Sequence, residues 1–184
     1  ELKPYLQLDQ MIAAAFDCAQ RLFGLTFQEL SLPLHHKDAR VWEVCRDGAH
    51  VALFIGDYFA RSGKRSGAWC SALQSQRKRP SPRAPIVINV CNFAKPSGGA
   101  PALLSFDDAR TLFHEFGHAL HQMLSDVSYS AVSDEADAMS GASTARARRR
   151  PEPHLPIDVG DPFESPDPLS ETTRHRLDRL FAHL

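Results

Sequence analysis

The feature of the sequence that most constrains the fold is one long amphipathic helix in the second half of the chain. Ser105-Phe106-Asp107-Asp108 has the form of a capping box, and its acidic residues suit the first turn of a helix. Apolar residues then repeat at helical spacing, which predicts a helix over residues 106–124. Because a helix with one apolar stripe buries that stripe, we expect it to pack against a sheet. The stripe consists of Leu112, Phe116, Ala119, Leu120 and Met123.

A second helix is predicted near the start of the chain. Its apolar residues run at helical spacing from Ile12 to Phe23, with Asp9 as a candidate cap and Gly24 suited to the end. Between the two helices, residues 61–83 are basic, serine-rich and interrupted by glycine and proline, which predicts an extended loop.

Three short strands are also predicted. The first two are joined by a tight turn at Asp47-Gly48, and the third is β-branched and mostly apolar, as is typical of the interior of a sheet. The strands are expected at residues 41–44, 51–55 and 86–90.

The character of the chain changes near residue 133. A basic run at residues 144–150 is followed by closely spaced prolines, which prevent regular helix or strand. We therefore predict a folded part over residues 1–133 and an irregular, Arg- and Pro-rich tail over residues 134–184. The fold class expected of the folded part is α+β, a small sheet with two long helices.

Charge and hydropathy exclude several classes of protein. The chain has 184 residues and a formal net charge of -1, so no overall field draws it to nucleic acid or to an anionic membrane. No apolar run approaches the roughly 20 residues that a membrane span needs. The chain begins with Glu1 and shows no charged-then-apolar leader, so we expect a piece of a longer protein without an export signal.

The four cysteines stand at wide intervals, and no two of them form a C-x-x-C pair. A chain of this size does not need disulfides, so we expect reduced, partly buried thiols and a cytoplasmic location, with two disulfides as the alternative.

The predicted helix over residues 106–124 contains the pattern H-E-x-x-H. His114 and His118 lie four residues apart, so their imidazoles are separated by about 40° around the helix axis and about 6 Å along it, and both can reach one metal ion. Neutral imidazole is a standard ligand of zinc. Glu115, next to the first ligand, is placed to take a proton from the attacking water and to pass it to the departing amine.

The alternative interpretation of this pattern is a solvent-facing polar stripe on an amphipathic helix. The context favours the metal site, because the pattern lies on the clearest helix of the chain. Gly117 in mid-helix costs about 1 kcal/mol relative to alanine, which predicts a close approach of another group over the helix.

Several segments of the chain resemble the thimet-oligopeptidase family of zinc metallopeptidases. The segment LKPY at residues 2–5 and RSGKRS at residues 61–66 are most similar to its bacterial peptidyl-dipeptidase (dipeptidyl carboxypeptidase) branch. The other matching segments are LFHEFGHALH at 112–121, LSDV at 124–127, GDYFAR at 56–61, GKRSGAW at 63–69, NVCNF at 89–93 and LLSFDD at 103–108.

The resemblance covers about residues 1–133 and implies part of a zincin-like catalytic domain from a mainly helical enzyme with a deep channel. It also implies short unfolded peptides as substrates, and strands before the zinc helix that bind the substrate backbone by strand addition. Compared with the family, the chain is several-fold shorter and lacks the N-terminal channel wall and the C-terminal part.

The resemblance also implies a third zinc ligand, a glutamate 25 residues beyond the second histidine. In this sequence that position is Ser143, and the agreement stops at Ser133, which indicates a reading-frame change, with a foreign tail or a splice as alternatives. Two substitutes are open, Glu135 and His121. Glu135 lies 17 residues past the second histidine. His121 lies about 10 Å along the axis from the first histidine, too far for all three histidines to hold one ion in tetrahedral geometry, which favours a histidine outside the ligand set.

The sequence therefore predicts a zinc-dependent hydrolase of short peptides, with His114 and His118 as metal ligands and Glu115 as general base and acid. The alternative is a non-catalytic remnant without the third ligand, and the chain as written is expected to bind zinc weakly and to be weakly active. A nucleic-acid surface formed by residues 77–79 and 146–150 is a third interpretation, which the balanced charge and the lack of interleaved aromatic residues disfavour.

Overall fold

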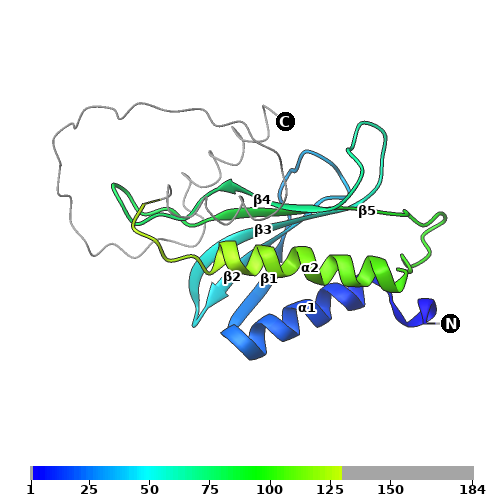
Figure 1. Cartoon of the computed structure of the whole chain (residues 1–184), viewed down its shortest axis with the longest axis horizontal. Coiled ribbons are helices and arrows are strands. Elements are labelled where there is room, and N and C mark those ends of the chain that lie inside the picture. Colours follow the sequence, from blue (N-terminus) through cyan, green and yellow to red (C-terminus); the bar gives the residue numbers. More distant parts are fainter. Residues whose placement is uncertain (1, 130–184) are drawn as a thin grey trace. The chain divides into compact units, whose positions relative to one another are not determined.

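A computed structural model describes residues 2–129, and these residues have the α+β architecture predicted from the sequence. They form one five-stranded sheet, two α-helices and a short 3-10 helix (Figure 1). The tail predicted over residues 134–184 lies outside the described residues. In chain order the elements are η1 (Lys3–Tyr5), α1 (Leu8–Phe23), β1 (Leu25–Leu30), β2 (Arg40–Arg46), β3 (Ala49–Phe59), β4 (Trp69–Gln74), β5 (Ile86–Phe93) and α2 (Phe106–Met123).

The sheet is mixed, with the strand order β1-β2-β3-β5-β4. Strands β1, β2 and β3 pair antiparallel, and the predicted turn between β2 and β3 has positive φ at Asp47 and Gly48, as a two-residue hairpin turn requires. Strand β5 pairs parallel with β3 and antiparallel with β4. This order confirms the interior position predicted for β5 and leaves β1 and β4 at the two edges.

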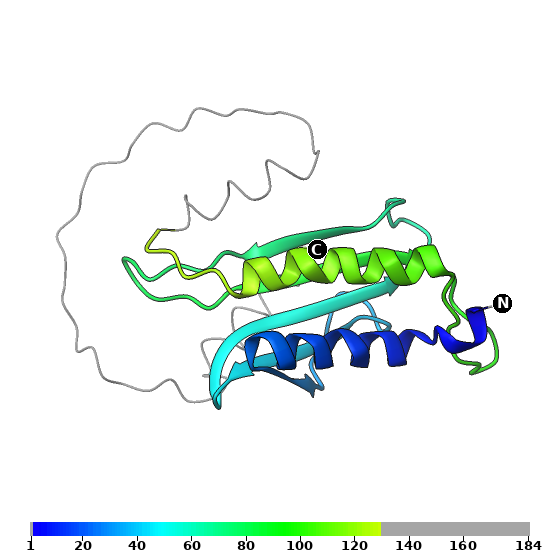
Figure 2. The same ribbon diagram turned by 60° about the horizontal axis from the view of Figure 1, so that its bottom comes forward.

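Both helices lie on the same face of the sheet, α1 against β1 and α2 against β4 and β5 (Figure 1). Figure 2 shows the two helices side by side, and residues of α1 and α2 contact each other. The predicted packing of the apolar stripe of α2 is confirmed, with Leu120 half-buried at its margin. The residues of α2 that are buried in the core cluster are Ala109, Leu112, Phe116, Ala119 and Met123.

An aromatic cluster joins the two helices to the sheet. The ring centroids of Phe16 in α1 and Phe116 in α2 are 5.7 Å apart, and Phe54 of β3 lies edge-on to Phe116 at 5.5 Å. Trp42 of β2 stacks on Phe54 at 5.7 Å. Burial of each such ring stabilises the fold by about 1.5–3 kcal/mol, so the cluster fixes the rotation of α2 about its own axis.

The predicted capping box at the start of α2 is present. The Ser105 hydroxyl accepts a hydrogen bond from the Asp108 backbone N–H at 3.0 Å, and the Asp108 carboxylate accepts one from the Ser105 backbone N–H at 3.0 Å. The helix ends at Met123, one residue before its predicted end. The local signal at its N-terminus therefore places the start of the helix that carries the H-E-x-x-H pattern.

Two predictions about the other elements are wrong. Asp9 does not cap α1, because the N-cap residue is Gln7, and the Asp9 carboxylate instead accepts a hydrogen bond from Arg40 at 2.7 Å. The extended loop predicted over residues 61–83 contains the edge strand β4. All residues of β4 are half-buried, so the strand shows no alternation of buried and exposed side chains, and its pairing with β5 stabilises it. The end of α1 at Gly24 is confirmed, since this glycine adopts the left-handed conformation with φ of 69°.

Two glycines in these elements differ in the space around them. A Cβ atom added to Gly56 in β3 would overlap with the ring of Tyr58, which is buried. A Cβ atom added to Gly117 in α2 meets no heavy atom within 4 Å among the described residues. The close approach predicted over Gly117 is therefore not made by any part of residues 2–129.

This contrast predicts opposite effects of the same substitution. We expect Gly56→Ala to destabilise the fold by about 1–3 kcal/mol, because the buried Tyr58 ring leaves no room for a methyl group. Gly117→Ala should stabilise it by up to about 1 kcal/mol, because alanine is the better helix former. Urea unfolding followed by circular dichroism measures both effects. A destabilised Gly117→Ala variant would show that a group beyond residues 2–129 packs against α2.

Candidate metal centre on helix α2

His114 and His118 project together from the exposed side of α2. Their Nε2 atoms are 3.1 Å apart, and their rings meet edge to face with centroids 4.7 Å apart. Both side chains are exposed, because the packing of Phe116 and Ala119 turns the opposite side of the helix into the core. The structure thus brings the two predicted ligands together. The two nitrogens that could share a metal ion face each other.

The spacing of these nitrogens fits two ligands of one zinc ion. Two nitrogens that each lie about 2.0–2.1 Å from a tetrahedral zinc ion are about 3.3 Å apart, close to the 3.1 Å between His114 and His118. Within residues 2–129, however, no group of three histidine, cysteine, aspartate or glutamate side chains could hold a metal. His121 therefore does not complete the site in this part of the chain, and Glu135 and Ser143 lie outside the described residues.

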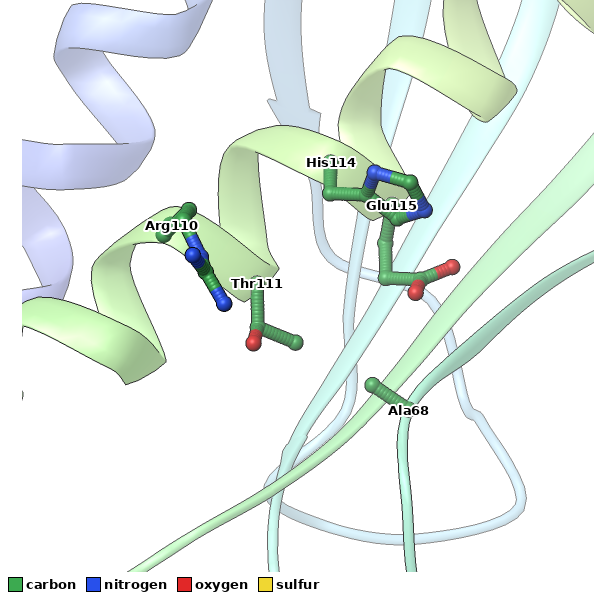
Figure 3. Close-up of a pocket in the computed structure, with 5 residues that line it drawn as sticks. All are labelled: Ala68, Arg110, Thr111, His114 and Glu115. Carbon is green, nitrogen blue, oxygen red and sulfur yellow. The ribbon is translucent and has the colours of Figure 1, made fainter.

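Glu115 lies beside this pair and points towards the sheet. Its side chain is buried, and together with Ala68, Arg110, Thr111 and His114 it lines an open pocket of about 540 Å³. Figure 3 shows its carboxylate directed towards Ala68, while the ring of His114 leaves the same turn of α2. A carboxylate in this position can exchange a proton with a molecule bound in the pocket.

The thiol of Cys91 in β5 lies near the Glu115 carboxylate in the core. Burial raises the pKa of Cys91 to about 12, and the negative charge of Glu115 adds to the rise. The free thiol therefore stays protonated at neutral pH, which disfavours Cys91 as a nucleophile beside the pocket. All four cysteines are free, as the sequence predicts.

A buried ion network at the end of β3 holds the loop that leads to Ala68. Arg61 donates to both oxygens of Asp57 at 2.7 and 2.8 Å, and Lys64 donates to Asp57 at 3.0 Å. His35 reaches the second Asp57 oxygen at 3.0 Å. Lys64 also donates to the backbone oxygen of Phe59 at 2.9 Å, so the network fastens the chain that follows β3 to the end of the strand.

The network lowers the pKa of the Asp57 carboxyl well below its usual range. Burial alone would raise this pKa, but hydrogen bonds from His35, Arg61 and Lys64 outweigh the burial. The pKa of Lys64 is also lowered, because burial disfavours its charge and Arg61 repels it, against the attraction of Asp57. One carboxylate thus accepts from two cationic donors and a histidine, which is why its ionised form is held so strongly.

Asn92 in β5 completes the attachment of this loop. Its side-chain amide donates to the backbone oxygens of Arg65 at 2.7 Å and Gly67 at 2.6 Å. Ala68, the next residue, lines the pocket opposite α2. The sheet therefore sets the position of the pocket wall that faces Glu115.

These positioning residues were not predicted as part of the site. Asp57, Arg61 and Lys64 lie in segments that resemble the family, but the resemblance gives no role to any of them. A signal was available in the spacing, because one aspartate precedes an arginine by four residues and a lysine by seven on a segment that turns back after a strand.

Comparison with known proteins places the chain among peptidases. A model described as peptidase family M3 matches residues 1–144. The chain is 46% identical over 136 residues to a dipeptidyl carboxypeptidase of Salmonella typhimurium, a match that covers 72% of this chain and 20% of the relative. It is 30% identical over 190 residues to oligopeptidase A of Escherichia coli, covering 99% of this chain and 28% of the relative.

The extent of these matches bears on the rest of the chain. The chain spans between a fifth and a third of the length of these relatives. The family match continues past residue 133 to residue 144, and the match to oligopeptidase A includes nearly the whole chain. The comparisons do not favour the non-catalytic remnant, while the domain boundary at residue 133 stays a prediction.

Among the described residues, neither α-helix has the length and apolar character that a membrane span requires.

The buried network predicts a specific response to acid. Because the folded-state pKa of Asp57 lies below its ordinary value of about 4, its ionised form contributes stability that is present above pH 4 and is lost as the pH falls through the folded-state pKa. We expect Asp57→Asn to cost about 3–5 kcal/mol at pH 7, because it leaves Lys64 buried without its counter-charge.

Urea unfolding between pH 7 and pH 2 measures this response, and the variant should lose less stability than the wild type on acidification. The control is Asp38→Asn, which removes a more exposed ion pair with Lys95 and should cost at most about 1 kcal/mol at pH 7. Equal costs for the two variants would contradict the role of the Asp57 network.

Proposed function

The chain belongs to peptidase family M3, a family of metallopeptidases, and from that premise we propose that it carries the catalytic helix of a zinc-dependent enzyme that hydrolyses short peptides. The observation that carries the proposal is the pair of imidazole nitrogens 3.1 Å apart beside a buried carboxylate that lines an open pocket. The names of the relatives, dipeptidyl carboxypeptidase and oligopeptidase A, support peptides as the substrates.

His114 and His118 would hold the metal ion through their Nε2 atoms. The chemistry that zinc supplies when bound is Lewis-acid activation of water and of a peptide carbonyl. The open pocket and the exposed rings give a substrate access to this side of α2. A third protein ligand would come from beyond residues 2–129, where Glu135 is a candidate.

Glu115 would act as general base and then as general acid. Its carboxylate accepts a proton from the attacking water and then donates that proton to the amine nitrogen as the peptide bond breaks. Its burial in the pocket wall holds the carboxylate in one place for both transfers. Of the described residues, none forms an ion pair with Glu115 that would occupy the carboxylate.

Strand β4 is the proposed guide for the substrate backbone. It is an edge strand, so the side away from β5 has backbone N–H and C=O groups that an extended peptide can pair with. Ala68, directly before β4, lines the pocket with Glu115 and His114. A peptide added to this edge would thus pass the candidate metal ligands.

We also propose a cytoplasmic location for the protein, which the name of a cytosolic relative in Arabidopsis thaliana supports.

The assignment of the metal ligands is tested by zinc affinity. We expect His114→Ala and His118→Ala each to weaken zinc binding by about tenfold or more, because each removes one of a small number of protein ligands. His121→Ala is the matched control, a histidine on the same helix that should leave the affinity unchanged. Competition with a chromophoric zinc indicator measures all three. An equal loss in the control would replace the assigned pair by a site that includes His121.

The role of Glu115 is tested in a frame-restored version of the chain that is extended to the full length of its relatives. We expect Glu115→Gln to lower kcat by at least about a hundredfold while zinc stays bound, because the amide keeps the shape of the side chain but accepts no proton. Glu43→Gln is the control, since Glu43 is equally buried at 8% exposure but pairs with His50 in the sheet. Turnover of a quenched fluorescent peptide at a normal rate in Glu115→Gln would remove Glu115 from this role.

A further inference from the structure

The pocket beside the candidate metal ligands contains one strongly basic side chain among the described residues that line it, Arg110. Arg110 lies one helical turn before His114 on α2, about 6 Å from it along the axis. Figure 3 shows Arg110 and Thr111 on one turn of the helix and His114 and Glu115 on the next. The guanidinium group is thus part of the same open pocket as the proposed catalytic groups.

The hydrogen-bonding capacity of this guanidinium is largely unused by the described residues. Its ion-pair partner in that part of the chain is Asp107, with an Arg110 Nη2 to Asp107 Oδ1 distance of 3.9 Å, which is too long for a hydrogen bond. Both side chains are largely exposed, at 76% and 85%. A contact of that kind contributes little and does not hold the guanidinium away from a ligand.

The charges of the pocket are separated. Arg110 and Glu115 differ by five positions, which places their side chains about 140° apart around the helix axis. An anionic group bound at Arg110 would therefore lie at the opposite margin of the pocket from the Glu115 carboxylate. The planar guanidinium fork matches a carboxylate with two parallel hydrogen bonds, which a lysine could not provide.

We propose that Arg110 is a specificity-determining residue that binds a carboxylate group of the peptide substrate. An extended peptide advances about 3.3 Å per residue, so a span of about 6 Å places this carboxylate about two residues from the bond at the His114 and His118 pair. The carboxylate is either the side chain of an aspartate or glutamate at that position or the C-terminus of the peptide. The inference rests on the proposed function for the identity of the ligand as a peptide.

Binding and turnover are measured with three peptides that share one core sequence. The first has glutamine at the variable position and a C-terminal amide, the second has glutamate and the amide, and the third has glutamine and a free C-terminus. Fluorescence anisotropy gives the Kd of each for the Glu115→Gln protein with zinc, and kcat/KM is measured with Glu115 intact. The variants are Arg110→Gln and Arg110→Lys, and the control is Arg46→Gln, which removes an exposed arginine at the end of β2.

We expect one acidic peptide to bind about three- to fivefold more tightly than the neutral peptide, the size typical of an exposed ion pair, and the preference to shrink at high salt. Arg110→Gln should abolish the preference, Arg110→Lys should retain part of it, and Arg46→Gln should leave it unchanged. The peptide that shows the preference identifies the source of the carboxylate. A preference that persists in Arg110→Gln, or its absence in the wild type, overturns the inference.

The two proposals fail in different ways in this experiment. If no peptide is hydrolysed by the frame-restored, full-length version with Glu115 intact, the proposed function fails, while the anisotropy measurement still decides whether Arg110 binds a carboxylate. If all peptides are hydrolysed with the same kcat/KM in wild type and Arg110→Gln, the proposed function stands and the inference about Arg110 fails.

Discussion

The burial of Phe116 between α1 and the sheet sets the orientation of every catalytic group proposed here. Its ring contacts Phe16 and Phe54, so α2 cannot rotate about its axis without exposing the centre of the aromatic cluster. With Phe116 directed inwards, the helical period directs His114 and His118 outwards, and Glu115 falls at the boundary between core and pocket. The chemistry of the site is in this sense a consequence of how the opposite face of the helix packs.

The pocket has a second wall that depends on electrostatics and not on apolar packing. Asp57 and Lys64 are both nearly inaccessible to solvent, at 3% and 5% side-chain exposure, and burial of such charges costs several kcal/mol unless they are paired. Asp57 meets that condition by accepting from several donors at once, and Asn92 anchors the same loop from β5. The loop before β4 is therefore fixed at both ends, so Ala68 can hold a constant distance from α2.

The sequence predicts α2 well because the signals for it are local. The capping box at Ser105 and the apolar repeat that includes Phe116 lie within one segment, and so does the spacing of His114 and His118. Strands β1 and β4 are missed because they are edge strands whose stability comes from pairing with distant segments. The network of Asp57 is only partly local, since Arg61 and Lys64 follow it by four and seven residues but its third partner, His35, is 22 residues away.

The contact between the two histidines also limits how they could hold a metal ion. A hydrogen bond of 3.1 Å between two Nε2 atoms uses the lone pair of one of them. A metal ion held by both Nε2 atoms would take the place of this hydrogen bond, because each ring would then bind the ion through the lone pair of its own Nε2. The rings of His114 and His118 are exposed and already face each other, so this replacement needs no conformational change of α2.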